Sequence, residues 1–261
     1  MPIAKRAVLE ALRLDPALAH AYTSLAWVTV CYDWNWAEGL ALAQKAVVLE
    51  PNYAFGHYAI GAIYRMLGRI SEARVKVEQS LRLDPLSISA HRLLGLALTL
   101  EGRFHEAERR LLAARALAPA SPELAWMMST LYITQGRMED GLRYARECQS
   151  DPPAPRNLGI LAHALAAAGQ EQEAREILRR IEEMSVRAYV DPWTFCRLHT
   201  ALGENEKAIE CLARSFEERS TYALIARVDP LLKPLQTDPR FGELIARLNM
   251  PTRPRSRAAK R

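Results

Sequence analysis

Residues 54–85 read AFGHYAIGAIYRMLGRISEARVKVEQSLRLDP, and this stretch is enough to predict the fold. Apolar side chains recur three and four residues apart, which is the spacing of one face of a helix. They are Ile60, Ile63, Tyr64 and Leu67 before Gly68, then Ala73, Val77 and Leu81 after it. Because glycine can end a helix and proline suits the loop that follows one, the stretch predicts two helices, one closed by Gly68 and one by Pro85.

The same two residue types return along the chain at a nearly constant interval. The prolines are Pro16, Pro51, Pro85, Pro119 and Pro153, in steps of 35, 34, 34 and 34 residues. The glycines, out of phase with them, are Gly68, Gly102, Gly136, Gly169 and Gly203. A fixed period of this length with two helices in each repeat is typical of a helical solenoid. We therefore expect an all-α chain of stacked antiparallel helix pairs.

Each period also carries the same residue types at the same places. In the period that starts at Ala54 these are Ile60-Gly61, Tyr64, Gly68, Ala73 and Leu83-Asp84-Pro85. In the next they are Leu94-Gly95, Leu98, Gly102-Arg103-Phe104, Ala107 and Ala118-Pro119. The pattern resembles that of tetratricopeptide repeats (TPRs). The resemblance implies a right-handed superhelical solenoid whose concave wall, formed by the first helix of each pair, binds other proteins.

The periods divide the chain into four parts. Residues 1–18 hold only the second helix of a unit, and residues 19–220 hold six TPR-like units. Residues 221–250, broken by three X-Pro pairs, predict C-terminal capping helices, and residues 251–261 predict a disordered basic tail. Because a stack needs a cap at each end, the half unit at the start suggests an upstream signalling domain or self-association at the open N-terminal face.

Two segments depart from the general TPR pattern. They are Tyr32-Asp33-Trp34-Asn35-Trp36 and the run from Ala226 to Pro251 that contains Asp238-Pro239-Arg240-Phe241. They resemble the C-terminal TPR array of bacterial signalling and transcriptional regulators. That resemblance implies a bacterial, cytoplasmic protein. It implies no activity, because the catalytic or DNA-binding half of such regulators has no counterpart in these residues.

Charge and apolar content exclude several classes of function. The 35 Lys and Arg exceed the 30 Asp and Glu by five, and the tail alone supplies five cations, so the rest is formally neutral. Nucleic-acid binding is therefore not expected, although weak, salt-dependent binding through the Arg-rich tail is the alternative function that stays open. No run of about 18 apolar residues predicts a membrane span.

Motifs for catalysis and cofactor binding are absent from the sequence. It contains no nucleophile elbow, phosphate-binding loop, dinucleotide fingerprint or zinc-protease motif. Cys196, His199 and Cys211 could meet as metal ligands, but other units carry Ala, Gly or Tyr at the corresponding inward positions, which favours packing. We therefore expect no enzyme activity, catalytic residue, metal or cofactor.

Aromatic and arginine side chains recur on the predicted concave wall. A buried core would not favour the arginines, and solvent alone would not favour the aromatics, whereas both types carry binding energy at interfaces. The predicted groove residues are Trp27, Phe55, Tyr58, Arg65, Arg92, Trp126, Arg156, His163, Trp193 and Arg197. We expect an adaptor, a scaffold or the sensory part of a regulator that binds an acidic and apolar segment. The alternative is that these aromatics only pack against neighbouring first helices.

Overall fold

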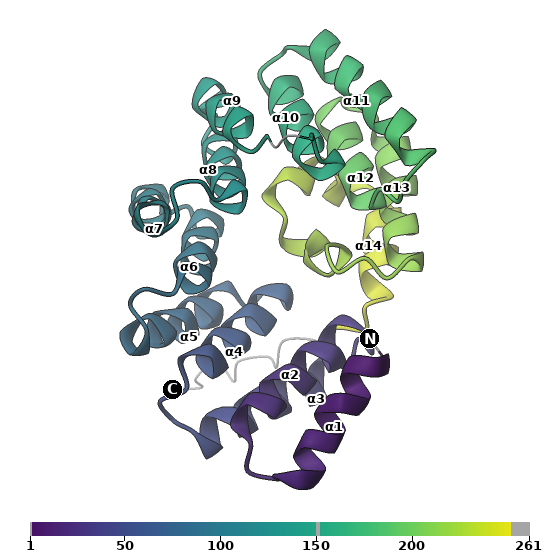
Figure 1. Cartoon of the computed structure of the whole chain (residues 1–261). Coiled ribbons are helices and arrows are strands. Elements are labelled where there is room, and N and C mark those ends of the chain that lie inside the picture. The colour runs from purple at the N-terminus through teal and green to yellow at the C-terminus, as the bar shows by residue number, and fades with distance from the viewer. Residues whose placement is uncertain (1, 150–151, 252–261) are drawn as a thin grey trace, which may run out of the picture.

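The computed structural model describes residues 2–149 and 152–251, and all regular elements in these ranges are helical (Figure 1). The elements are α1 (Pro2–Leu14), α2 (Ala19–Cys31), α3 (Trp36–Leu49), α4 (Ala54–Met66), α5 (Ile70–Leu83), α6 (Ile88–Leu100), α7 (Phe104–Leu117), α8 (Pro122–Thr134), α9 (Met138–Glu147), α10 (Pro155–Ala167), α11 (Glu171–Ser185), α12 (Pro192–Ala201), α13 (Asn205–Glu217), the 3-10 helices η1 (Ala223–Val228) and η2 (Pro230–Thr237), and α14 (Pro239–Ala246).

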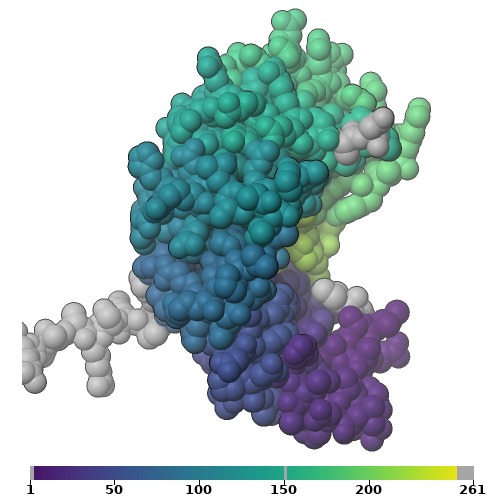
Figure 2. Space-filling model, turned by 60° about the vertical axis from the view of Figure 1, so that its left-hand side comes forward, coloured from purple at the N-terminus to yellow at the C-terminus, as the bar shows by residue number. Residues whose placement is uncertain are grey.

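Consecutive helices form antiparallel pairs that stack in chain order. α2 packs against α3, and the same pairing repeats as far as α12 and α13. In Figure 2 the colour of the outer surface changes gradually from purple to green, because each pair lies beside its neighbours in sequence. The predicted all-α, right-handed superhelical solenoid is confirmed. None of the described helices is both long enough and apolar enough to cross a bilayer.

Glycine ends the first helix in five of the six pairs, as the sequence predicts. Gly68, Gly102, Gly136, Gly169 and Gly203 all have φ between +71° and +79°, a conformation that suits a residue without a Cβ. The pair of α2 and α3 is different. Its longer turn places Trp34 at φ +57°, and Asn35 caps α3 by accepting a hydrogen bond from the Glu38 N–H.

The first full pair also contacts the end of the chain, so the solenoid closes on itself. The indole Nε1 of Trp36 donates a 2.6 Å hydrogen bond to the carbonyl oxygen of Leu248. Arg219 donates a 2.5 Å hydrogen bond to the carbonyl oxygen of Tyr32, and its guanidinium lies over the Trp34 ring at 4.7 Å. One hydrophobic cluster therefore joins α2, α3 and α4 to α12, α13 and the C-terminal segment.

Residues 221–250, which the sequence predicts as a cap, lie partly inside the superhelix. α14 packs on α13, as a cap would. η1 instead contacts α4, and η2 contacts α8 and α12, so this yellow segment faces the inner side of the stack in Figure 1. Leu224, Leu232 and Leu235 are completely buried there. Because this segment occupies part of the concave space, the inner wall is divided into pockets and does not form one continuous trough.

Candidate binding site on the inner wall

Two neighbouring pockets lie on the inner wall of the superhelix. The N-terminal pocket, about 340 Å³, is bounded by α2, α4, α6 and η1, and its main side chains are Trp27, Tyr58, Arg65, Arg92 and Leu96. The C-terminal pocket, about 220 Å³, is bounded by α8, α10 and α12, and its main side chains are Arg156, Ile160, Val190, Trp193 and Arg197. Trp126 of α8 and Tyr222, which directly precedes η1, line both pockets.

The N-terminal pocket combines aromatic rings with two arginines. The rings of Trp27 and Tyr58 are 6.4 Å apart. Among the described residues, no ion pair or hydrogen bond joins the guanidinium of Arg65 or Arg92 to another side chain, and the Nε of Arg65 is buried. Burial lowers the pKa of Arg65 to about 10, which leaves it charged at neutral pH. The pocket therefore presents positive charge beside apolar surface.

The C-terminal pocket is organised around the ring of Trp126. The guanidinium of Arg156 lies 4.9 Å and that of Arg197 5.4 Å from this ring, and Arg156 also lies 5.6 Å from the Tyr222 ring. The nearest carboxylate to Arg197 belongs to Asp229, at 3.6 Å. Guanidinium groups that stack on aromatic faces keep their N–H groups available for an acceptor in the plane of the guanidinium.

Eight of the ten predicted groove residues line these two pockets, and Phe55 and His163 do not. Phe55 lies at the outer rim, is 44% exposed and stacks on Tyr58 with ring centroids 5.3 Å apart. His163 is buried between α10 and α12, and its Nδ1 lies 3.0 Å from the carbonyl oxygen of Arg197. His163 lines a third, wider cavity of about 640 Å³ that residues of η1 and η2 also border.

Several residues of the pockets could not be predicted from the repeat pattern. Tyr222 comes from the C-terminal segment, which has no period, and Tyr189 and Asp191 come from the loop before α12. Asp229, from the same C-terminal segment, lines neighbouring cavities and lies 3.6 Å from Arg197. The only signal in the sequence was the Asp-Pro pairs at Asp191 and Asp229. Each of these aspartates starts a helix by accepting a hydrogen bond from the backbone N–H two residues later.

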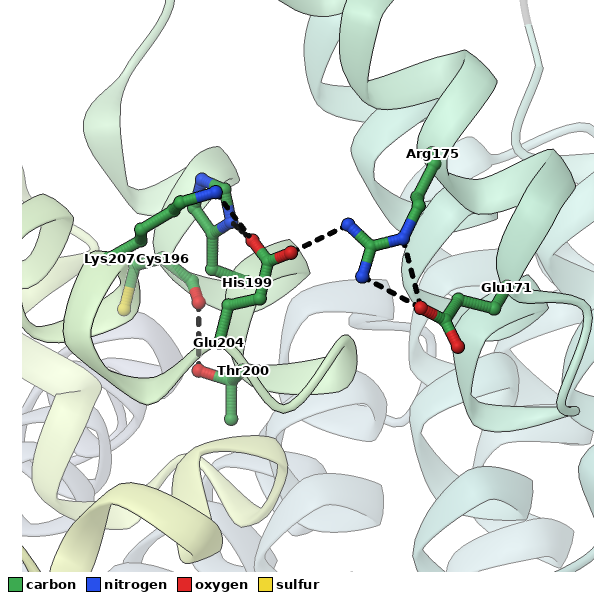
Figure 3. A network of polar contacts seen from close by, with 7 residues as sticks. All are labelled: Glu171, Arg175, Cys196, His199, Thr200, Glu204 and Lys207. Atoms are coloured by element: carbon green, nitrogen blue, oxygen red, sulfur yellow. Dashed lines mark hydrogen bonds and ion pairs between the residues drawn. The ribbon is translucent and has the colours of Figure 1, made fainter.

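The cysteines and histidine considered as metal ligands are used for packing and ion pairing (Figure 3). His199 Nδ1 lies 2.8 Å from Glu204 Oε2, and Glu204 also accepts hydrogen bonds from Arg175 and Lys207. The fully buried sulfur of Cys196 points away from this network, and burial raises the pKa of its thiol. Within the described residues, no three His, Cys, Asp or Glu side chains are grouped so as to hold a metal ion.

The tail on which the nucleic-acid alternative depends lies mostly outside the described residues. These end at Pro251, so residues 252–261, with all five cations of the tail, are not covered. The alternative therefore still depends on composition alone.

Comparison with known proteins supports the TPR fold. No protein-family model matches the sequence, and no curated protein does. A tetratricopeptide-repeat protein from Parabacteroides merdae superposes with a TM-score of 0.63 at 15% identity, covering 95% of this chain and 91% of that chain. A chain of the APC/C hetero-tetramer Cut9–Hcn1 gives 0.62 at 15% identity, covering 92% and 44%. PilW, a type IV pilus biogenesis factor, gives 0.59 at 21% identity, covering 67% and 82%. The chain has the TPR fold.

Proposed function

We propose that this chain is a non-enzymatic protein–protein interaction module that binds a peptide or protein segment on its inner wall. The observation that carries the proposal is the grouping of Arg65, Arg92, Arg156 and Arg197 with aromatic rings around two adjoining pockets. Asp229 is the carboxylate buried among them. A segment with acidic and apolar side chains would complement both the charge and the rings.

The biological setting belongs to the same proposal. We infer an adaptor, a scaffold or the sensory part of a bacterial regulator that acts in the cytoplasm. A structural neighbour, a chain of the APC/C hetero-tetramer Cut9–Hcn1, works within a complex with another protein. It supports an interaction role for a stack of this shape, and its low identity transfers no partner.

A row of aromatic rings leads from the surface into the N-terminal pocket. Ring centroids are 4.2 Å apart for His20 and Tyr53, 6.2 Å for Tyr53 and Phe55, and 5.3 Å for Phe55 and Tyr58. Trp27 continues the row at 6.4 Å from Tyr58. Since Phe55 is an exposed apolar ring and Trp27 lines the pocket, the row provides a contact surface for a segment that enters there. Because η1 and η2 occupy the centre of the superhelix, we expect the bound segment to be short and to place few of its residues inside the pocket.

A random peptide library displayed on phage tests this proposal. We expect the purified chain to enrich peptides that place Asp or Glu beside Leu, Phe or Trp. In calorimetric titrations of the enriched peptide, a variant with Arg92→Ala and Trp126→Ala should bind at least tenfold more weakly, because truncating an interface hot spot costs about 2 kcal/mol or more.

Arg110→Ala is the matched control for this experiment, because Arg110 is an exposed arginine on the outer helix α7. It should leave the affinity unchanged. If the library yields no enriched peptide, or if wild type and the double variant bind the peptide equally well, the inner wall is not the peptide-binding site.

A further inference from the structure

The C-terminal pocket has the size of a small organic molecule. Its volume is about 220 Å³. An engineered apolar cavity of about 150 Å³ is large enough to bind benzene. The walls are largely apolar, with Ile160, Val190 and the ring of Trp193 facing the space, and Gly159 contributes no side chain to it. One ring with a short substituent therefore fits, whereas a folded protein element does not.

The two arginines of this pocket form only long ion pairs. Arg156 and Arg197 both lie at the Trp126 ring, and their nearest carboxylates are Glu123 at 3.7 Å and Asp229 at 3.6 Å. These distances are longer than a charge-assisted hydrogen bond, which is about 2.7–2.9 Å. A ligand carboxylate would find two guanidinium groups within the same small volume.

The carboxylate of Asp191, which also lines the pocket, is already engaged. Its Oδ1 accepts from the Trp193 backbone N–H at 2.9 Å, and its Oδ2 accepts from the hydroxyl of Ser220 at 2.7 Å. Both oxygens are therefore used to hold the loop before α12. Among the described residues no ion pair joins Asp191 to either arginine, although its negative charge remains at the pocket wall.

Three buried donors in the walls of this pocket have no hydrogen-bond partner among the described residues. They are the indole Nε1 of Trp126, the indole Nε1 of Trp193 and the Nε of Arg197. The three residues are only 9%, 4% and 8% exposed. An unmade hydrogen bond at a buried donor costs about 1–3 kcal/mol, so such a cluster needs an explanation.

One water molecule could serve two of these donors. A separate cavity of about 20 Å³, lined by Trp126, Arg197 and Asp229, has room for one water molecule that could serve the first two residues. Trp193 does not line that cavity, whereas its ring does line the C-terminal pocket. The indole nitrogen of Trp193 is itself covered, so the ring and not its N–H is what Trp193 offers to a ligand in the larger space.

We propose that the C-terminal pocket binds a small organic anion, in which one planar ring carries a carboxylate. The ring packs between the aromatic walls of Trp126 and Trp193. The carboxylate pairs with Arg156 and Arg197. This binding needs no protein partner, although the site occupies one half of the proposed interaction wall.

Direct titration of the purified full chain with matched acids and amides tests the inference. The probes are benzoate, phenylacetate, 3-phenylpropionate and indole-3-acetate, each compared with its neutral amide by calorimetry. We expect at least one acid to bind tenfold or more tightly than its amide. Arg156→Gln should weaken that acid about tenfold or more, because it removes a charge-assisted hydrogen bond to the carboxylate.

Two further variants make the result specific. Arg179→Gln removes an exposed cation on α11 and should leave binding unchanged, and circular dichroism melts check that every variant is folded. Arg92 lines only the N-terminal pocket. The variant Arg92→Ala should therefore keep the affinity for the acid, even if it abolishes peptide binding. Failure of the proposed function and failure of the anion site are thus distinguishable.

N-acetyl-Gly-Phe, compared with its C-terminal amide, shows whether the carboxylate comes from a free acid or from a peptide end. The tighter of the two carboxylate sources identifies the natural form of the ligand, and either supports the site. Equal binding of every acid and its amide, the absence of binding by all probes, or full affinity in Arg156→Gln would overturn the inference.

Discussion

The imidazole of His163 is held as a neutral group inside the wall between α10 and α12. It is 5% exposed, and its Nδ1 lies 3.0 Å from the Arg197 carbonyl oxygen. Because a carbonyl oxygen only accepts hydrogen bonds, Nδ1 carries the proton. Burial, assisted by the nearby charge of Arg197, lowers the pKa of His163 to about 3.

This environment predicts that His163 makes the stability of the fold depend on pH. Its folded pKa lies below the unfolded value of about 6.5, so its contribution is complete above about pH 6.5 and is lost as the pH falls toward 3. Below about pH 6.5 the unfolded chain takes up a proton that the folded chain does not, and the free energy of unfolding drops by up to about 1.4 kcal/mol per pH unit.

Urea unfolding of wild type and His163→Gln between about pH 7 and about pH 5 measures this dependence. Wild type should be the more stable at the higher pH, and the difference between the two proteins should shrink as the pH falls. A difference that stays constant over this range would show that His163 does not titrate as its burial requires.

The sequence predicts a side chain's environment well wherever the repeat period controls it. Tyr58, Arg92 and Trp126 line pockets because they sit on the inward face of first helices, where the resemblance to TPRs places them in each period. Tyr222 and Asp229 could not be placed in the same way. They belong to a segment without a period, and its position depends on contacts with helices that are distant in sequence.

At the scale of the elements, the two helices of a pair approach each other closely at a slot reserved for small residues. A Cβ added to Gly61 of α4 would lie 2.6 Å from Val77 Cγ2 and 3.1 Å from the Ala73 carbonyl oxygen of α5. Ala73 is itself completely buried. The Leu-Gly-like dipeptide of the repeat therefore sets the distance between the helices, which is why periodicity was enough to predict the pairs.

Gly61→Ala should destabilise the chain by about 1–3 kcal/mol, because the added methyl group overpacks this contact. Gly242→Ala is the control. Gly242 lies within α14, a Cβ there would meet no neighbouring atom within 4 Å, and alanine in a helix is more stable than glycine by about 0.5–1 kcal/mol. Chemical denaturation should thus give changes of opposite sign. Changes of the same sign would contradict the close approach of α4 and α5.

The closure of the solenoid becomes visible only at the scale of the whole molecule. The segment from Tyr32 to Trp36 interrupts the repeat pattern, and it is this segment that meets Arg219 and Leu248, which lie 187 and 212 residues further along the chain than Tyr32 and Trp36. Trp34 also meets Phe216 edge to face, with ring centroids 6.2 Å apart. An irregular segment is therefore used where the first and last units meet, and the repeat period alone does not reveal that contact.

A double variant with Trp36→Phe and Arg219→Ala should open this closure without unfolding the repeats. It removes the hydrogen bonds to the carbonyl oxygens of Leu248 and Tyr32. The Leu248 carbonyl is the buried one of the two, and leaving it unpaired costs about 1–3 kcal/mol. The helical circular dichroism should persist, because the contacts within each helix pair are untouched. Small-angle X-ray scattering should show a larger radius of gyration, and the affinity of the N-terminal pocket for the enriched peptide should fall because η1 no longer lines it.

Arg214→Ala is the control, because Arg214 is an exposed residue on the same helix as Phe216. It should change neither the radius of gyration nor the affinity. If the double variant keeps the wild-type radius of gyration, contacts other than these two hydrogen bonds hold the first and last units together.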